Sequence, residues 1–565
     1  MIIKDLYPEK AQYLTGEPVN IIAELTTEGR VGDTLLVLTV TRLEQTISRT
    51  VHSITQKADN NGTITLNAGI YDTPFGGFGV KLALFEDGEE KEARSTAFDM
   101  VASPERSVRY GFLSDFSADD KDTADVSTLR KYHINFVQYY DWSYRHDNLV
   151  AEQEEYTDMM GKPVSLAAVK NKIAACRSYG MKSLGYGAVY AASKDFYEQH
   201  KDWGLYTAAG EPFVFIDVFY IMNVMRACPW HEHIVGQYQR AVQEVGFDGI
   251  HMDTYGFPKT AYSHYHHTEL LRMERHYPEL IQSTKEALNK VKDDNYLIFN
   301  NVGNWPVDTV ANAPQSAVYI EVWPPYGQYC HIKQLITDAK RACGNAKPVI
   351  LAAYLAPFRL EDAQSAMNAA LLLTAAITTA GGTHLLLGEE NAVLTQGYYV
   401  DHSILTQAQA ALMRRYYDFI IRYMELFYDS ALQDVTMTHM GWDNTEYRCL
   451  HPNWSACGEA DRLWLTIKEK PDLKLISLIN LCGSVDALWN KGKAQPETQH
   501  DLPFEVQVDL PIDGVFFATP DDEDGSAKAL DYTLKKTSYG LSLCFTVPKV
   551  RYWSLVYIRL KEEAE

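Results

Sequence analysis

The chain has 565 residues, of which 46% are hydrophobic and 22% charged, and its formal net charge at pH 7 is −22. This length is too great for one hydrophobic core and predicts several domains, and the composition is that of a folded protein, not a disordered one. The negative charge excludes nucleic acids and anionic membranes as partners, because both are bound through cationic side chains.

The N-terminus has no basic segment followed by an apolar core, so no signal peptide is visible. We therefore expect a cytoplasmic protein, or a secreted one if a signal peptide has been removed. The eight cysteines are widely spaced and form no CxxC or Cys/His pattern, which predicts reduced thiols and no metal or other cofactor. The apolar stretch 369–387 contains several threonines and two adjacent glycines, so it predicts a buried helix followed by a strand.

Residues 1–105 contain short segments of alternating polarity, such as 19–25 and 34–40, with turns at 59–62 and 87–88. This pattern predicts an immunoglobulin-like β-sandwich. Similar strands return after residue 430, for example at 463–467 and 475–481, and predict an antiparallel β-sandwich over residues 429–565.

Residues 106–428 alternate between strand and helix patterns. Eight strands with intervening helices predict a central (β/α)8 TIM barrel, so that the fold class is a multidomain chain with a barrel flanked by two β-sandwiches. The predicted strands are 110–116, 136–142, 183–190, 249–255, 297–303, 318–323, 349–354 and 384–388, and the clearest predicted helices are 170–179, 233–245, 279–291, 332–342 and 361–378.

Two of these strands end on a carboxylate, in the segments GIHMDTYG (249–256) and AVYIEVWP (317–324). The alternation within each strand places His251 and Asp253 on one face, and Tyr319 and Glu321 on the corresponding face of the other strand. Active sites of such barrels lie at the carboxyl ends of the strands, so Asp253 and Glu321 are expected to face one cavity. A carboxylate pair of this kind suits acid/base chemistry on a sugar acetal. Asp248 enters the same strand as Asp253 from its other end and is expected to be structural.

Other strand ends carry aromatic and amide side chains, which bind sugars by stacking and by hydrogen bonds to hydroxyl groups. The alternative for each of them is a packing role within the barrel. The predicted substrate-binding residues are Tyr140, Asp141, Tyr186, Tyr190, His251, Asn300, Asn301 and Trp323.

The segments QYYDW (138–142), FDGIHMDTYG (247–256), FNNVG (299–303) and YIEVWP (319–324) resemble glycoside hydrolase family 66. That family comprises dextranases and cycloisomaltooligosaccharide glucanotransferases, and its domain order is similar to the one predicted here. The short segments at 221–223 and 398–399 also resemble family segments.

The resemblance implies retaining cleavage of α-1,6-glucosidic bonds in dextran or isomaltooligosaccharides by a dextranase-like endo-α-1,6-glucanase. It implies that Asp253 is the nucleophile and Glu321 the acid/base, with their carboxyl groups about 5–5.5 Å apart. These roles require a raised pKa for Glu321 and an ionised Asp253. His251 either contacts the sugar or supports Asp253.

Two features bear on the place of the chain within the family. Only about thirty residues separate the seventh and eighth predicted strands, whereas the glucanotransferases carry an inserted carbohydrate-binding module there, so a hydrolase is favoured. Glu389-Glu390-Asn391 differs from the Gly- and Asp-rich turn expected after the eighth strand of the family.

Three alternatives remain open at this stage. The first is a transglycosylase that forms cyclic or longer isomaltooligosaccharides. The second is a non-catalytic glucan-binding protein. The third is a metal-dependent hydrolase, whose ligands would come from His231, His233, His264, His266 and His267.

Overall fold

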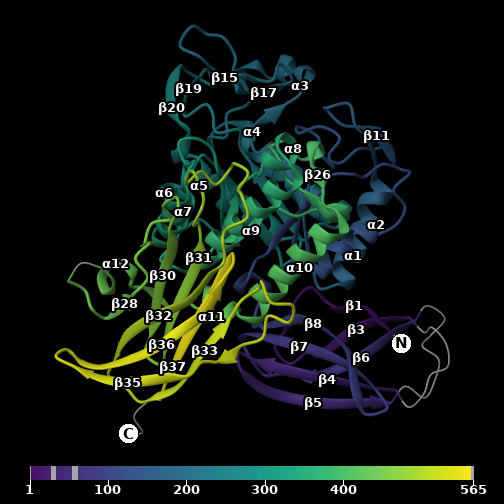
Figure 1. Cartoon of the computed structure of the whole chain (residues 1–565). Coiled ribbons are helices and arrows are strands. Elements are labelled where there is room, and N and C mark those ends of the chain that lie inside the picture. The colour runs from purple at the N-terminus through teal and green to yellow at the C-terminus, as the bar shows by residue number, and fades with distance from the viewer. Residues whose placement is uncertain (1, 27–33, 54–61, 442, 562–565) are drawn as a thin grey trace.

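The computed structural model describes residues 2–26, 34–53, 62–441 and 443–561, and its centre is a parallel barrel (Figure 1). Eight parallel strands follow one another around it in the order β24-β23-β22-β21-β18-β13-β10-β9. All eight predicted barrel strands are confirmed. They are β9 (Tyr110–Leu113), β10 (Phe136–Tyr139), β13 (Lys182–Ala188), β18 (Gly249–Asp253), β21 (Tyr296–Val302), β22 (Ala317–Glu321), β23 (Val349–Ala352) and β24 (Thr383–His384).

Helices lie between the strands and cover the outside of the barrel. In α7, the buried residues Ile332, Leu335, Ile336 and Ala339 form one apolar face with helical spacing. The expected helices are confirmed, with starts that differ by a few residues: side-chain caps begin α2, α7 and α9, and a proline stands in the first turn of α4 and α5. The main helices are α1 (Ala124–Lys131), α2 (Leu166–Ser178), α4 (Pro229–Arg240), α5 (Tyr277–Asn289), α7 (Tyr329–Ala342), α9 (Ala363–Thr379) and α10 (Gln407–Arg422).

The apolar stretch 369–387 forms most of α9 followed by β24, as predicted. From Ala366 to Thr379 every side chain of α9 is buried. Within the part of the chain that the structure describes, no helix has the length and apolar character needed to cross a membrane.

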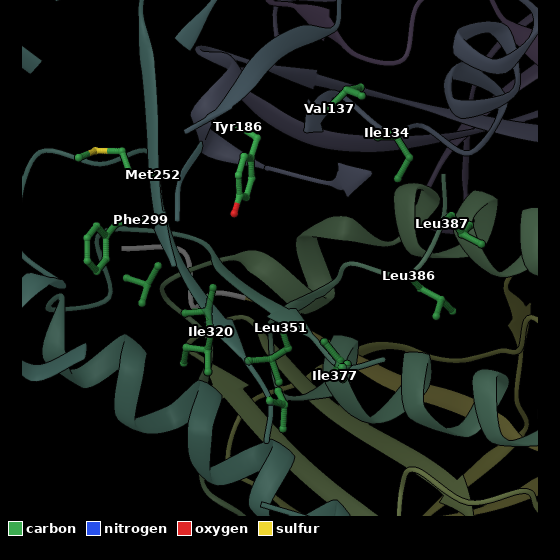
Figure 2. Close-up of a cluster of buried hydrophobic side chains, with 14 of the residues drawn as sticks. Ile134, Val137, Tyr186, Met252, Phe299, Ile320, Leu351, Ile377, Leu386 and Leu387 are labelled. Atoms are coloured by element: carbon green, nitrogen blue, oxygen red, sulfur yellow. The ribbon is translucent and has the colours of Figure 1, made fainter. Parts of the chain in front are cut away.

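The strands of the barrel separate two hydrophobic cores. Met252, Phe299, Ile320 and Leu351 belong to the large core between the strands and the helices (Figure 2). The neighbouring residues of the same strands belong to a second core inside the barrel, which includes Ile298, Tyr319 and Ile350. This alternation follows from the two-residue period of a strand, and it directs every second side chain of β18, β21 and β22 inward.

The barrel closes where the segment after β24 meets β9. The backbones of Phe112 and Gly388 form an isolated parallel bridge there. The buried carboxylate of Glu389 accepts hydrogen bonds from the Ser114 backbone N–H at 2.8 Å, the Ser114 hydroxyl at 2.5 Å and the Asp115 N–H at 3.1 Å. The turn that departs from the family pattern thus joins the last strand to the first.

Sheets on either side of the barrel enclose cores of their own. In the N-terminal region, a three-stranded sheet and a five-stranded sheet share the core that includes Ile21, Leu38 and Phe98. The predicted turn at 87–88 joins β7 and β8, whereas most of the predicted turn at 59–62 lies outside the described residues. The strands are β1 (Ile2–Pro8), β3 (Pro18–Thr26) and β6 (Thr63–Ile70) in one sheet, and β2 (Tyr13–Leu14), β8 (Glu89–Val101), β7 (Phe75–Glu86), β4 (Thr34–Arg42) and β5 (Gln45–Ser53) in the other.

The C-terminal region has a seven-stranded and a four-stranded sheet, which share the core that includes Leu465, Ile476 and Val506. Domain limits and sandwich class remain predictions for both flanking regions. The larger sheet contains β27 (Gln433–Asp434), β29 (Trp454–Ser455), β30 (Leu463–Lys470), β31 (Leu473–Asn480), β33 (Ile512–Ala518), β34 (Lys528–Ala529) and β37 (Trp553–Leu560), and the smaller one β28 (Tyr447–Cys449), β32 (Gln499–Val508), β35 (Tyr532–Thr537) and β36 (Gly540–Val550).

Polar side chains connect these regions to the barrel. Arg109, just before β9, makes a two-pronged buried ion pair with Asp99 of β8, at 2.8 and 3.0 Å. The hydroxyl of Tyr552, just before β37, donates to Asn368 of α9 at 2.7 Å. All eight cysteines are free thiols, as predicted.

Replacing Glu389 tests its role in closing the barrel. Glu389→Ala leaves the buried N–H and hydroxyl of Ser114, and the N–H of the exposed Asp115, without their acceptor and is expected to cost about 2–4 kcal/mol of unfolding free energy. Glu389→Gln keeps one oxygen and should cost less. The exposed neighbour Glu390 is the control. If the Glu389→Ala variant has the same Tm as the Glu390→Ala variant, Glu389 does not have this role.

Candidate active site

A cavity of about 580 Å³ opens among residues at the carboxyl ends of the barrel strands, and both predicted catalytic carboxylates line it. Asp253 is the last residue of β18 and Glu321 the last residue of β22. β21 lies between these two strands. The prediction that the two groups face one cavity is therefore confirmed.

The side-chain amide of Asn300 in β21 joins the two carboxylates. Its Nδ2 atom donates to Asp253 Oδ1 at 2.6 Å and to Glu321 Oε2 at 3.0 Å. Since both hydrogen bonds start at the same nitrogen, the two carboxylate oxygens lie within the sum of these lengths, about 5.6 Å.

A tyrosine hydroxyl holds each carboxylate from its other side. Tyr186 of β13 donates to Asp253 Oδ2 at 2.5 Å, and Tyr354, just after β23, donates to Glu321 Oε1 at 3.0 Å. The hydroxyl of Tyr399 lies 3.3 Å from that of Tyr354 and 3.0 Å from that of Tyr319. Four strands of the barrel, together with the segment just after β23, therefore contribute to the arrangement of two acidic groups.

The surroundings of the pair raise both pKa values. Burial, together with the nearby charge of Glu321, raises the pKa of Asp253 to about 7, although hydrogen bonds from Tyr186 and Asn300 act in the opposite direction. Burial likewise raises the pKa of Glu321, opposed by hydrogen bonds from Asn300 and Tyr354. Both pKa values are raised, not that of Glu321 alone, because burial disfavours the charged form of each carboxyl group, and the charge of Glu321 adds to the rise for Asp253.

His251 lies in the interior layer with Asp253. Its ring stacks between those of Tyr110 and Tyr186, and its Nδ1 atom is 3.0 Å from the Tyr110 hydroxyl. Burial lowers the pKa of His251 to about 3, so that the imidazole is neutral. It lines the cavity and also supports the tyrosine that holds Asp253, so both interpretations offered by the sequence are compatible with its position.

Six of the eight predicted substrate-binding residues line the cavity: Tyr140, Asp141, Tyr186, His251, Asn300 and Trp323. Tyr190 and Asn301 do not. Asn301 follows Asn300 directly in β21 and therefore faces away from the barrel interior, where its amide donates to the Phe299 and Tyr319 carbonyls. The Tyr190 hydroxyl donates to the Phe257 carbonyl and accepts from the Tyr255 N–H. These two residues hold backbone next to the cavity.

Several lining residues were not predicted from the sequence. Tyr354 ends the seventh predicted strand, and that position was the available signal. His146, Phe215 and Phe219 also line the cavity. They lie in long connections after β10 and β13, where no periodic pattern relates a residue to the barrel axis.

Asp248 has the structural role that its position predicts. It is buried at the start of β18, forms an ion pair with Lys292 and accepts from the Ser183 N–H at 3.0 Å. It does not line the cavity.

Two of the histidines considered as metal ligands lie within hydrogen-bond distance of backbone carbonyls. His231 Nδ1 lies 2.8 Å from the Val224 carbonyl and His233 Nε2 lies 2.7 Å from the Asp147 carbonyl. Among the described residues, no three or more His, Cys, Asp or Glu side chains converge as ligands for a metal ion.

The family model of glycosyl hydrolase family 66 matches residues 8–557, and the chain belongs to this family. The chain is 23% identical to a cycloisomaltooligosaccharide glucanotransferase of Niallia circulans, over 99% of its own length and 72% of that protein. It is 25% identical to a dextranase of Streptococcus salivarius, over 75% of its own length and 56% of the dextranase. The crystal structure of a Paenibacillus cycloisomaltooligosaccharide glucanotransferase with cycloisomaltoheptaose has the same fold, with a TM-score of 0.89, 21% identity and coverage of 98% of this chain and 99% of that one.

The raised pKa of Asp253 predicts a pH-dependent stability. In the folded protein the pKa is about 7, against 3.8 as the ordinary value, so the folded state holds more protons than the unfolded state between these values. The contribution to stability is fully present below pH 3.8 and is lost as the pH rises to about 7. Asp253→Asn removes this titration, so its Tm should exceed that of the wild type at pH 7, and the excess should shrink towards pH 4.

Thermal unfolding between pH 4 and pH 8 measures this difference. The control is Asp119→Asn, because Asp119 is exposed. If the difference in Tm between Asp253→Asn and the wild type does not change with pH, the pKa of Asp253 is not raised in the folded protein.

Proposed function

We propose that this protein is a retaining glycoside hydrolase that cleaves α-1,6-glucosidic linkages of dextran or isomaltooligosaccharides, as a dextranase-like endo-α-1,6-glucanase. The observation that carries the proposal is the Asp253–Asn300–Glu321 arrangement. The limit of about 5.6 Å between the bridged oxygens agrees with the roughly 5–5.5 Å of retaining pairs, whereas inverting pairs need about 6.5–9.5 Å to admit a water molecule.

In this mechanism Asp253 attacks the anomeric carbon while Glu321 protonates the departing O6 atom. The bond from the anomeric carbon to O6 breaks as the bond to Asp253 forms, and a covalent glycosyl-enzyme results. Glu321, now ionised, then removes a proton from a water molecule whose oxygen bonds to the anomeric carbon. The bond to Asp253 breaks, which releases the sugar, and leaves Asp253 ionised and Glu321 protonated as before. The hydrogen bonds from Tyr186 and Asn300 orient Asp253 for the attack.

The substrate class is supported by the relatives and by the lining of the cavity. The similar proteins are named as a dextranase and as cycloisomaltooligosaccharide glucanotransferases. Tyr140, Phe215 and Trp323 offer aromatic surface in the cavity, while Asp141 and Asn300 offer polar atoms to sugar hydroxyls.

Hydrolysis is favoured over transfer by the connection between β23 and β24. It consists of α8 (Pro357–Leu360) and α9 with short loops, with no room for an inserted module. Transfer to a sugar hydroxyl is the second candidate, because the similar glucanotransferases share the fold and because a glycosyl-enzyme can be intercepted by any hydroxyl that reaches it. The products decide: linear isomaltooligosaccharides support hydrolysis, and cyclic or longer ones support transfer.

The organisation of the chain forms part of the proposal. We assign residues 1–105 to an immunoglobulin-like β-sandwich, residues 106–428 to the barrel and residues 429–565 to a C-terminal β-sandwich. The two pairs of sheets with separate cores support this division. A cytoplasmic location remains a prediction. If the protein acts in the cytoplasm, we propose short isomaltooligosaccharides as its substrate.

Replacing each carboxylate tests the assigned roles. Asp253→Ala should abolish turnover of isomaltooligosaccharides while the protein stays folded. Glu321→Gln should slow cleavage of the natural linkage by about 10²–10⁴-fold, because O6 then departs without a proton. It should be far less impaired on an aryl isomaltoside whose leaving group needs no protonation.

The measurement is kcat/KM of each variant on both substrates. The anomeric configuration of the first product is determined by NMR. Asp248→Asn is a matched control, because Asp248 directly precedes β18, the strand that Asp253 ends, and lies outside the cavity. Unchanged turnover by Asp253→Ala, or a first product of inverted configuration, would refute the proposal.

Removing the Tyr354 hydroxyl should move the pH profile. This hydroxyl donates to Glu321 and favours its ionised form, so it lowers the pKa of Glu321. Tyr354→Phe therefore raises that pKa, Glu321 stays protonated to higher pH, and the alkaline limb of kcat/KM moves upward. A limb that moves to lower pH would contradict the assignment of Glu321 as the acid.

A further inference from the structure

A second cavity of about 510 Å³ adjoins the active site on the side of Glu321. It shares Trp323, Tyr354 and Gln396 with the first cavity but not Asp253. Tyr354 donates its hydrogen bond to Glu321, and Trp323 follows Glu321 by two residues. The two cavities therefore meet beside the proposed acid, although Glu321 itself lines only the first. Tyr354 follows β23, which lies on the other side of β22 from β18, so the second cavity lies on the side away from the proposed nucleophile.

The outer wall of this cavity comes from the C-terminal region. Leu488, Trp489 and Asn490 line it, although they follow the barrel strands by more than one hundred residues of sequence. They belong to a segment, residues 487–490, that lies against the loop after β22.

Hydrogen bonds hold this segment in place. The Trp489 N–H donates to the Gly327 carbonyl at 3.2 Å, and the Tyr329 N–H donates to the Ala487 carbonyl at 3.0 Å. The Trp489 indole N–H donates to the Tyr326 carbonyl at 2.6 Å. The segment is thus fixed to the strand connection that carries Glu321, and it forms a preformed wall.

The exposed groups of the cavity suit a pyranose ring. Trp323 and Leu488 are each 40% exposed and offer apolar surface for the face of a sugar. Arg359, at the end of α8, is exposed, and its guanidinium has no hydrogen bond or ion pair within the part of the chain that the structure describes. The side-chain oxygen of Asn490 accepts a hydrogen bond from the Ala356 N–H at 2.9 Å. The NH₂ group of Asn490 can therefore donate to a ligand. The apolar surface can contact the face of a sugar ring, while the N–H groups of Arg359 and Asn490 can donate to the hydroxyls around it.

We propose that the second cavity binds the glucosyl unit on the leaving-group side of the cleaved bond, and that the C-terminal region thereby forms part of the active site. This inference rests on the proposed function. When Glu321 protonates O6, the departing glucan must lie on the side of Glu321 that faces away from Asp253, and this cavity adjoins that side through Trp323 and Tyr354. A sugar that replaces water as acceptor enters the same cavity, because transfer is the reverse of departure.

Two leaving groups separate binding in this cavity from catalysis. Isomaltohexaose places glucosyl units in the leaving-group side of the site. The leaving group of α-isomaltotriosyl fluoride is fluoride, so this substrate leaves the second cavity empty. Arg359→Ala should lower kcat/KM on isomaltohexaose by about tenfold, the value of one hydrogen bond from a charged donor, and should change kcat/KM on the fluoride by less than about twofold. Arg341→Ala, an exposed arginine on α7 outside both cavities, is the matched control.

A second variant tests the wall itself. Leu488→Ala should lower the fraction of glycosyl-enzyme transferred to added isomaltose relative to water, with the fluoride as donor, since the acceptor loses apolar contact. Circular dichroism and Tm confirm that each variant is folded.

The outcomes distinguish the two proposals. If the wild type turns over neither substrate, the proposed function fails. If the wild type turns over both, Arg359→Ala affects the two substrates equally or not at all, and Leu488→Ala leaves the partition between isomaltose and water unchanged, the function stands and the leaving-group site is wrong. A loss confined to isomaltohexaose supports the inference.

Discussion

A single side-chain amide, that of Asn300, determines how the two acidic groups of this protein relate to each other. It donates to Asp253 and to Glu321, so it sets their separation and opposes the rise in the pKa of each. This contact depends on the register of three adjacent strands. In β18 and β21, Met252 pairs with Phe299, and in β21 and β22, Val302 pairs with Glu321. A shift of one residue in either pairing would turn one of the three side chains to the outside of the barrel.

The register in turn depends on closure of the barrel. The contact between the first and last strands is a single isolated bridge, and the buried Glu389 carboxylate supplements it by binding the backbone after β9. The turn that departs from the expected family pattern therefore has a structural role. At the start of the same strand, the buried Arg109–Asp99 pair joins the barrel to the N-terminal sheets, so both ends of β9 are held by charge-assisted hydrogen bonds.

The chemistry of the site costs stability. Two carboxyl groups in a cavity walled by tyrosines and by His251 are harder to ionise than in water, and the folded protein pays this cost at neutral pH. For the proposed double displacement the same cost is useful, because the pair then keeps one proton near neutral pH, ready for a leaving group. The C-terminal segment 487–490 adds a wall beside the proposed acid, and this makes the flanking region more than a support.

The sequence by itself determined the order of the barrel strands, the residues that face its interior and the identity of the acidic pair. These follow from the two-residue period of a strand and from the position of strand ends, which are local properties. The same reasoning distinguishes Asp253 from Asp248. Strand parity also places Asn300 and Asn301 on opposite faces of β21, so the prediction that both bind the substrate is wrong for Asn301.

Only the tertiary structure decided which side chains outside the barrel strands reach the two cavities. Phe215, Phe219 and His146 come from the long connections after β13 and β10, and Leu488 and Asn490 come from a region far along the chain. Their positions depend on how loops pack against one another and on hydrogen bonds between distant segments, for which no periodic pattern exists in the sequence. The raised pKa of Asp253 was likewise decided by burial and by the approach of Glu321, both of which arise when strands far apart in the chain become neighbours.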